Sequence, residues 1–164
     1  MIKLKKLSEK KHISSNYLKW MNDYEVHKYT EQKYEKHTKS KIKKFVKTIN
    51  KSKNNILYGI FFKNIHIGNI KLGYINKIHK TADISYFIGE EKYVGKGYAT
   101  IAIRQILAYS KKIGLRKITA GCYSINKGSI KVLKKNGFKR EGVLKKQILF
   151  NKKRYDQYMF GKLI

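Results

Sequence analysis

The chain has 164 residues, 41% of them hydrophobic, and a formal net charge of +29. That length and apolar content are typical of one folded domain with its own core, so we expect a single domain over residues 1–164. No apolar run approaches the ~20 residues of a membrane helix, and the first seven residues lack the apolar segment of a secretory signal. The single cysteine, Cys122, excludes an internal disulfide and a cysteine-based zinc site. We therefore expect a cytoplasmic protein without a metal.

The strong positive charge is spread along the whole chain rather than gathered in one tail. Only four of the 39 basic residues are arginine, and proline is absent. This pattern favours a compositional bias towards AT-rich codons over a dedicated nucleic-acid surface. A basic nucleic-acid-binding module stays open as an alternative from another functional class. In either case the surface should attract phosphorylated ligands.

The N-terminal third predicts one short strand and three helical segments. Residues 2–7 alternate weakly, as a short strand would. Residues 14–16 offer side-chain caps to a first helix, and residues 24–29 form a further helical turn. Thr38 predicts the cap of a third helix, whose apolar residues recur every three or four positions: Ile42, Phe45, Val46 and Ile49.

A meander of three antiparallel strands is predicted next, because the apolar residues now alternate with a period of two. Turns are expected at Lys63-Asn64 and Asn76-Lys77, and a bulge at Gly68. The three predicted strands cover residues 56–62, 65–74 and 82–88.

A glycine loop, Lys92 to Thr100, joins the third strand of this meander to a helix predicted over residues 98–113. The first N–H groups of a helix lack internal partners, and the helix dipole makes that end positive. Gly95 and Gly97 allow the backbone to turn tightly and to approach a ligand closely. The loop therefore predicts a phosphate or pyrophosphate site. It lacks the third glycine of a dinucleotide fingerprint and the G-x-x-x-x-G-K-[ST] pattern of a nucleotide-triphosphate loop.

The last third predicts a strand, a helix and a closing hairpin. Gly114 should end the helix that follows the glycine loop. A basic second helix over residues 127–136 should then stop at Gly137. The remaining predicted strands cover residues 117–123, 138–150 and 154–163.

This order of segments resembles the GNAT N-acetyltransferases along nearly the whole chain. The loop Lys92-x-x-Gly95-x-Gly97 stands where that family carries Gln/Arg-x-x-Gly-x-Gly/Ala, with Lys92 as a departure. Asn126-x-x-Ser129 and Lys134 to Phe138 also resemble family segments. The resemblance implies an α/β (α+β) fold. Its mixed, mostly antiparallel sheet of about seven strands would be flanked by helices and splayed where acetyl-CoA enters.

Two branches of the family share further segments with this chain. Lys96 to Thr100, Glu141-Gly142 and Arg154 to Asp156 resemble the branch that includes ribosomal-protein alanine acetyltransferases. Tyr17 to Asp23 resembles members that acetylate amino groups on nucleotide-linked sugars. These segments only suggest the substrate.

The resemblance implies acetyl-CoA as the acetyl donor. Its pyrophosphate would lie on the backbone N–H groups of Val94 to Ala99, and its pantetheine arm would pair with the end of strand 82–88 as an extra strand would. Asn126 would hold the arm from the other side, and Lys96 and Lys135 could meet the 3′-phosphate. Asn126 is also a plausible helix cap, and either lysine could simply be solvated. The expected contact residues are Tyr86, Phe87, Ile88, Val94, Gly95, Lys96, Gly97, Tyr98, Ala99, Thr100, Asn126, Ser129 and Lys135.

The resemblance also implies direct attack of a neutral amine on the thioester. Many members protonate the leaving thiolate with a tyrosine, but Leu133 stands at that position here. Ser129 is the first candidate for the proton donor and Tyr123 the second. Asp83 is the first candidate for the base, with Glu90 and Glu91 flanking the loop.

The acceptor is expected to be a small phosphorylated amine, in particular an amino sugar on a nucleotide diphosphate. Trp20 and Tyr29 could stack on its ring, and Asp23 is a further candidate contact. The alternative for Trp20 is a core anchor. A protein N-terminus is the second candidate acceptor, weakened because a glutamate of the ribosomal branch is replaced near Ile148. A CoA-binding protein without catalysis is a third hypothesis. No membrane or specific nucleic acid is expected as a partner, and a homodimer stays open.

Overall fold

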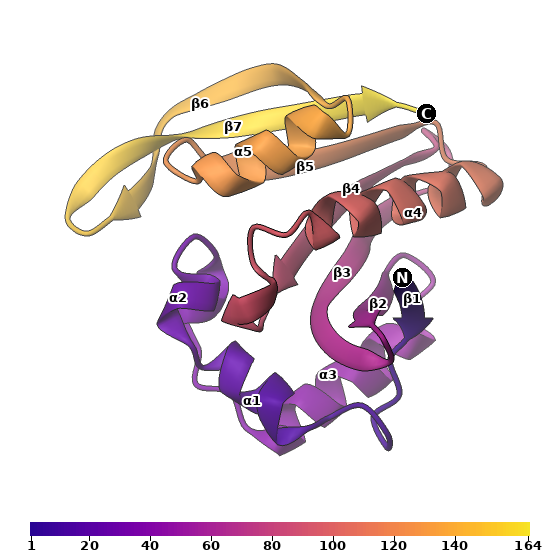
Figure 1. Cartoon of the computed structure of the whole chain (residues 1–164). Helices are drawn as coiled ribbons and strands as arrows, with labels where there is room; N and C mark the ends of the chain where they lie inside the picture. The colour runs from indigo at the N-terminus through magenta and orange to yellow at the C-terminus, as the bar shows by residue number, and fades with distance from the viewer.

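The centre of the molecule is one seven-stranded sheet in the order β1-β2-β3-β4-β5-β7-β6 (Figure 1). The computed structural model describes residues 1–164. The strands are β1 (Ile2–Lys6), β2 (Ile56–Phe62), β3 (Ile65–Asn76), β4 (Thr81–Ile88), β5 (Lys117–Tyr123), β6 (Lys139–Phe150) and β7 (Lys153–Leu163). The helices are α1 (Ser15–Met21), α2 (Tyr24–His27), α3 (Lys39–Lys51), α4 (Tyr98–Lys112) and α5 (Lys127–Lys135). Two 3₁₀ turns, η1 (Glu31–Tyr34) and η2 (Glu91–Tyr93), were not predicted.

The sheet divides between β4 and β5, its only parallel pair. Thr81 to Asp83 pair with Lys117 to Thr119, and beyond these residues the two strands separate. Residues 84–88 of β4 still pair with β3 on their other side. One edge of β4 is therefore left without a partner strand, and the sheet is splayed as the resemblance implied (Figure 1).

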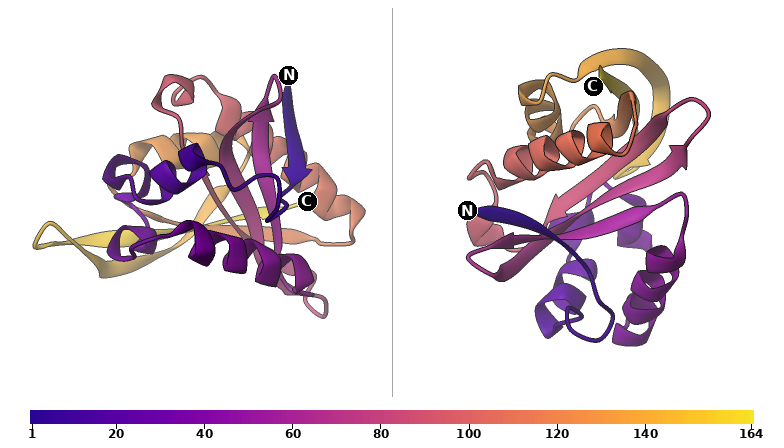
Figure 2. Two further views of the ribbon diagram at one scale, coloured as in Figure 1. Left: turned by 90° about the horizontal axis from the view of Figure 1, so that it is seen from below. Right: turned by 90° about the vertical axis from the view of Figure 1, so that its right-hand side faces the viewer.

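Helices cover both faces of the sheet (Figure 2), and a hydrophobic core lies on each face. The larger one packs α4 and α5 against the sheet and includes Ile103, Ile106 and Leu133, which are fully buried. The smaller one packs α1 and α3 against β2 and includes Trp20 and Val46. Because successive side chains of a strand point to opposite faces, β4 and β5 contribute to both sides of the splay.

Local sequence signals account for most of the boundaries. The side chains of Ser14, Thr38 and Asn126 each accept a backbone N–H of the helix that follows, as N-caps do. Gly114 and Gly137 end α4 and α5 with φ of 87° and 79°, a conformation that favours glycine.

Three details of the predicted elements needed correction or refinement. Phe45 was expected on the buried face of α3 but is 47% exposed, because Ile42, Val46 and Ile49 alone face the core. Lys153 belongs to β7, since the hairpin closes in two residues with positive φ, Asn151 and Lys152. The bulge in β3 falls at residue 67, next to Gly68, whose own Cβ would collide with the Phe87 carbonyl.

Neither a membrane span nor a metal centre is visible in this fold. None of the helices combines the length and the apolar character needed to cross a bilayer. No three His, Cys, Asp or Glu side chains are grouped so that they could hold a metal ion.

His27 couples the stability of the N-terminal helices to pH. Burial, followed by the charge of His37, lowers the pKa of His27 from 6.5 to about 4. Below pH 6.5 the unfolded chain binds a proton that the folded chain does not, so stability should fall as the pH drops from 6.5 towards 4. The loss should be on the order of 2 kcal/mol, or roughly 5 °C in Tm.

Thermal unfolding at pH 7.5 and pH 4.5 tests this coupling. The variant His27→Phe should lose part of the pH dependence, whereas His79→Gln, at an exposed turn, should keep it. An equal pH dependence in the parent and in His27→Phe would contradict the assignment. Burial also lowers the pKa of His66, which adds a contribution of the same sign to all three proteins.

Candidate functional site

The glycine loop presents an uninterrupted run of unpaired backbone donors. The N–H groups of residues 95–100 have no acceptor in the chain, and the first helical bond runs from the Ile101 N–H to the Gly97 carbonyl at 3.1 Å. The Val94 N–H, which was expected among the donors, instead donates to the Glu91 carbonyl at 2.9 Å. Gly95 and Gly97 have φ of 77° and 80°, which turns these groups outward at the positive end of α4. Six consecutive N–H groups at a helix N-terminus can donate hydrogen bonds to the oxygens of a phosphate or pyrophosphate.

The space beside this loop is open. An added Cβ at Gly95 or Gly97 would meet no protein atom within 4 Å. Lys96 and Lys135 are exposed and form no hydrogen bond or ion pair, so their charges are available to an anion. The ammonium of Lys92 instead lies 5.2 Å from the centre of the Tyr93 ring.

Tyr86 connects the open edge of β4 to the start of α5. Its hydroxyl lies 2.9 Å from Ser129 Oγ, and the Ser129 N–H donates to Asn126 Oδ1 at 3.0 Å. Burial raises the pKa of the Tyr86 phenol to about 12, so it stays protonated at neutral pH. The structure thus brings three predicted residues together beside the splay. Asn126 acts as the helix cap, and its side-chain amide N–H groups have no protein acceptor.

Leu133 is fully buried in the larger core, as expected for a residue that takes no part in proton transfer. Cys122 lies on the same side of β5 and is also buried. Burial raises the pKa of its thiol to about 11, which makes it unreactive at neutral pH.

Asp83 lies apart from Tyr86 and Ser129. It stands three residues before Tyr86 on β4, so the two side chains point to opposite faces of the sheet. Thr119 Oγ1 donates to Asp83 Oδ2 at 3.2 Å, where β4 and β5 still pair. Burial is the main cause that raises the pKa of the Asp83 carboxyl. Asp83 therefore lies at the closed end of the splay, on the face that α1 to α3 cover.

Tyr123 lies on the same face as Asp83, at the open end of β5. Its hydroxyl donates to Glu31 Oε1 at 2.7 Å, and its ring lies 6.2 Å from that of Tyr29. Burial and the Glu31 carboxylate raise the pKa of the Tyr123 phenol. Glu31 was missed in the sequence because it sits in η1, and 92 residues separate it from Tyr123. No local pattern signals such a pair.

Trp20 is not available to stack on a substrate ring. It is 2% exposed, and its indole ring packs against Gly89, where a Cβ would collide with it. The indole N–H donates to Glu90 Oε1 at 3.1 Å. Glu90 is one of the two glutamates that flank the glycine loop, and this hydrogen bond occupies its carboxylate. Glu91 remains exposed at the start of η2. Trp20 is thus a core anchor, and the ring-stacking prediction for it is corrected.

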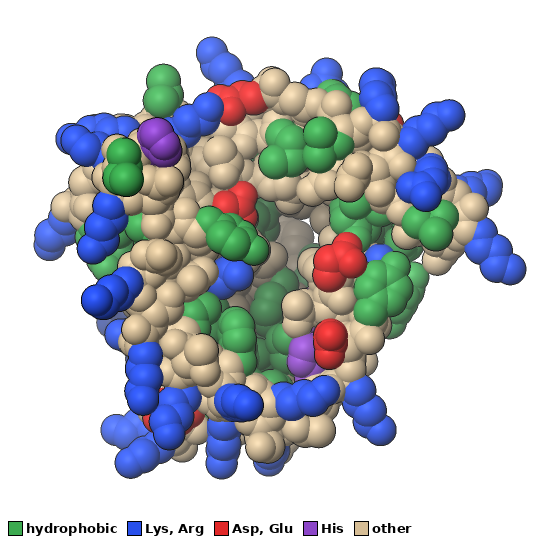
Figure 3. Space-filling model, turned by 180° about the vertical axis from the view of Figure 1, so that it is seen from behind, with side chains coloured by type: hydrophobic (Ala, Val, Ile, Leu, Met, Phe, Trp, Pro, Cys, Tyr) green, Lys and Arg blue, Asp and Glu red, His purple; other side chains and the backbone are tan.

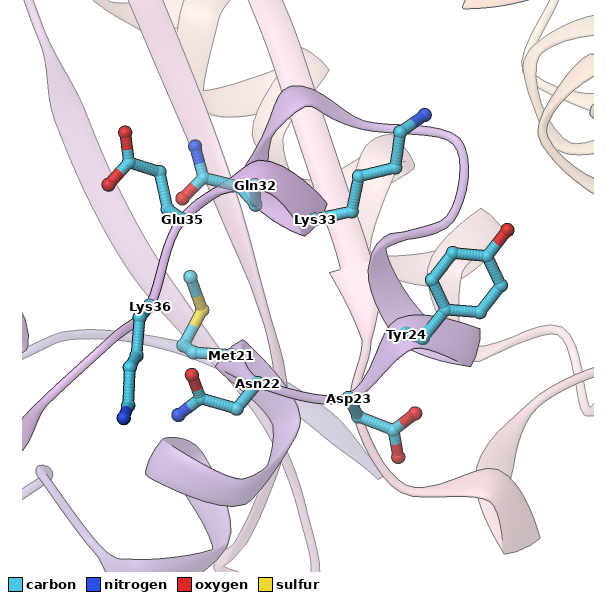
Figure 4. Close-up of a pocket in the computed structure, with 8 residues that line it drawn as sticks. All are labelled: Met21, Asn22, Asp23, Tyr24, Gln32, Lys33, Glu35 and Lys36. Carbon is cyan, nitrogen blue, oxygen red and sulfur yellow. The ribbon is translucent and has the colours of Figure 1, made fainter. Parts of the chain in front are cut away.

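Asp23 accepts the Glu25 N–H at 2.9 Å and thereby caps α2. It also lines a hollow of about 210 Å³ between α1, α2 and η1 (Figure 4). Asp23 and Glu35 point away from each other around this hollow (Figure 4). The hollow therefore offers no pair of converging carboxylates.

The face of the molecule seen in Figure 3 is hollowed at its centre. Acidic, hydrophobic and some basic side chains stand around the hollow, while most Lys and Arg side chains lie at the periphery (Figure 3). Acidic side chains are thus seen near the hollow although the chain has only ten Asp and Glu residues.

Comparisons with known proteins agree with this geometry. The family described as "Acetyltransferase (GNAT) domain" matches residues 2–139. A probable N-acetyltransferase of Bacillus subtilis (strain 168), YjcK, is 38% identical over 73 residues. The aligned segment covers 44% of this chain and 40% of that relative, which is less than half of either.

Two solved structures superpose on nearly the whole chain. RimL, a ribosomal L7/L12 α-N-protein acetyltransferase in complex with coenzyme A, gives a TM-score of 0.88 at 22% identity and covers 99% of this chain and 94% of that one. The microcin C7 self-immunity acetyltransferase MccE, in complex with acetyl-CoA and AMP, gives 0.83 at 24% identity and covers 99% and 92%. At this identity they confirm the fold that the sequence implied.

Proposed function

Because the chain belongs to the GNAT acetyltransferase family, we propose that it transfers the acetyl group of acetyl-CoA to a primary amine. The observation that carries this proposal is the run of six unpaired N–H groups beside the open edge of β4. Acetyl-CoA needs both features together: donors for a pyrophosphate and an extended edge for a pantetheine arm. Both solved relatives hold coenzyme A or acetyl-CoA.

The proposed contacts follow from these two features. The pyrophosphate would accept from the N–H groups of the loop, with Val94 to Thr100 around it. The pantetheine arm would lie along Tyr86 to Ile88, and the free amide N–H groups of Asn126 would face it from α5. Lys96 and Lys135 have no partner within the chain, so either ammonium can meet the 3′-phosphate.

Acetyl-CoA supplies an activated carbonyl. The amine nitrogen attacks it, the C–S bond breaks, one proton leaves the amine and one reaches the thiolate. A backbone N–H near Ile88 would stabilise the oxyanion. Ser129 would donate to the thiolate. Tyr86 would hold the serine hydroxyl in place, because its phenol stays protonated and lies 2.9 Å from Ser129 Oγ.

The residue proposed to remove the proton from the amine lies on the opposite face of the sheet from Tyr86 and Ser129. Asp83 is the proposed base, since its raised pKa brings it closer to the operating pH than an exposed carboxylate. Tyr123, the second candidate for the proton donor, already donates to Glu31 and lies on the face opposite Ser129, so it is not proposed to protonate the thiolate. A water would have to link Asp83 to the amine.

The acceptor is proposed only as a primary amine. An amino sugar on a nucleotide diphosphate depended on Trp20 as a stacking surface, and Trp20 is buried. Tyr29 alone remains half-exposed beside the splay. RimL acts on a ribosomal protein, so a protein N-terminus is the second acceptor to include in an assay.

The first prediction concerns the glycine loop. Gly97→Val should lower acetyl-CoA affinity by at least ~100-fold, because the branched side chain occupies the space of the pyrophosphate. Gly114→Val is the matched control, since it also has positive φ, 87° against 80°, and open surroundings, but lies at the other end of α4. Both variants should lose similar stability through backbone strain.

Calorimetric titration with acetyl-CoA, preceded by thermal unfolding of each variant, measures this difference. If folded Gly97→Val binds acetyl-CoA as tightly as Gly114→Val, the loop is not the pyrophosphate site.

The second prediction concerns proton transfer. Ser129→Ala should lower kcat by about 10²-fold at most, the low end for general acid catalysis, and leave acetyl-CoA affinity unchanged. Asp83→Asn should remove the fall in rate on the acidic side of the pH profile, where the raised pKa lets the parent carboxylate take up a proton. Glu141→Gln, whose carboxylate pairs with Lys117 at 2.8 Å, is the control.

A panel of amines is first screened for one that is acetylated. The steady-state rate of CoA release with that amine, measured across pH for the parent and the variants, then tests the roles of Ser129 and Asp83. An unchanged kcat in both variants would leave positioning of the amine as the main source of rate, and both roles would be withdrawn.

A further inference from the structure

One lysine of this chain is surrounded by aromatic rings. The Lys33 ammonium lies 4.9 Å from the centre of the Tyr34 ring, 5.2 Å from that of Tyr123 and 5.0 Å from that of Phe150. The three rings, called the aromatic cage below, come from η1, the end of β5 and the end of β6; Tyr34 is 68% exposed and forms the outer wall, and Tyr123 forms the buried one. Tyr29 packs against two of them, with ring centres 6.2 and 5.6 Å away.

The cage is built for a cation. A ring face attracts a cation within about 6 Å, most strongly where water is excluded. Tyr123 is 6% exposed, and its hydroxyl donates to the Glu31 carboxylate, which makes its ring richer in electrons. The only hydrogen bond of the Lys33 ammonium goes to the Lys28 carbonyl at 3.0 Å.

This arrangement is not a by-product of abundant lysine and tyrosine. The other cation–π contacts in the chain each place one cation over one ring, as Lys92 lies over Tyr93 and Arg140 over Tyr158. Only Lys33 has three. Rings from three segments distant in sequence converge on one point at the open end of the splay.

The cage cannot serve the amine that reacts. Aromatic faces and a carboxylate stabilise the charged form of an amine, whereas the attacking amine must be neutral. We propose that the cage is a subsite for a second, non-reacting alkylammonium group of the acceptor, and that Lys33 fills it when the acceptor is absent. This inference rests on the proposed function and narrows its acceptor to molecules with two cationic groups.

The net charge of +29 does not prevent such binding. At physiological ionic strength, charges more than about 8 Å away are largely screened, while the cage acts at contact distance. The Lys33 ammonium competes for the cage directly and is tethered to the site. An external cation can bind only while the Lys33 ammonium is out of the cage. Its apparent affinity is therefore reduced in proportion to the fraction of molecules in which the cage is free.

Binding of tetramethylammonium, which cannot be acetylated, tests the cage apart from catalysis. Lys33→Ala should bind this probe roughly tenfold more tightly than the parent in ligand-detected NMR, the size of a desolvated cation–π gain. Lys36→Ala removes a charge three residues away that lies over no ring, and should show no such gain. Adding Phe150→Ala to Lys33→Ala should abolish the gain. Equal affinity of Lys33→Ala and Lys36→Ala for tetramethylammonium would overturn the proposal that the cage binds an external cation.

Acetyl transfer then tests the subsite. Lys33→Ala should lower KM for 1,4-diaminobutane severalfold with kcat nearly unchanged, and leave KM for 1-aminobutane as it is. The KM values for the dipeptides Ser-Lys and Ser-Leu are compared in the same way. A lower KM for Ser-Lys alone would indicate that the second ammonium group belongs to a peptide rather than to a small diamine. Equal KM values in Lys33→Ala and Lys36→Ala for every two-cation acceptor would overturn the subsite. Probe binding without transfer to any amine would instead refute the proposed function and leave the cage as a cation site.

Discussion

The arrangement of this molecule depends on how soon β4 and β5 stop pairing. Their parallel ladder covers only three residues on each strand, and an edge of a central strand is then left open in the middle of a sheet. Unpaired backbone groups at such an edge are costly unless water or a ligand satisfies them. A soluble ligand that is extended and carries amide groups can satisfy them, and the glycine loop at the end of the same strand can hold its phosphates.

The two faces of the splay carry different polar side chains. On the side of α4 and α5, the Tyr86 hydroxyl, Ser129 and Asn126 form a connected polar group at the start of a helix. On the other side, Asp83, Tyr123 and Glu31 stand where α1, α2 and η1 approach the sheet. The period of two along β4 and β5 produces this division, because it sends neighbouring side chains to opposite faces. A donor on one face and an acceptor on the other can then meet across the gap between the strands.

Local signals in the sequence were enough to place most strands and helices and the glycine loop between β4 and α4. The glycines at 95 and 97, the caps at Thr38 and Asn126, and the period change near residue 55 each act through a few neighbouring residues. The contacts that were missed join distant segments. Tyr86 and Ser129 are 43 residues apart, Trp20 and Glu90 are 70 apart, and Glu31 and Tyr123 are 92 apart. The sequence left Trp20 open as either a ligand contact or a core anchor, because an indole can do both. The packing of Gly89 against that ring decides for the core.

The central claim is that the N–H groups of residues 95–100 hold the pyrophosphate of acetyl-CoA. Hydrogen–deuterium exchange of the backbone amides, with and without acetyl-CoA, measures these groups directly. Because they have no acceptor within the chain, they should exchange rapidly in the free protein and become strongly protected when acetyl-CoA is bound. Protection elsewhere, with exchange of residues 95–100 unchanged at saturating acetyl-CoA, would contradict the account.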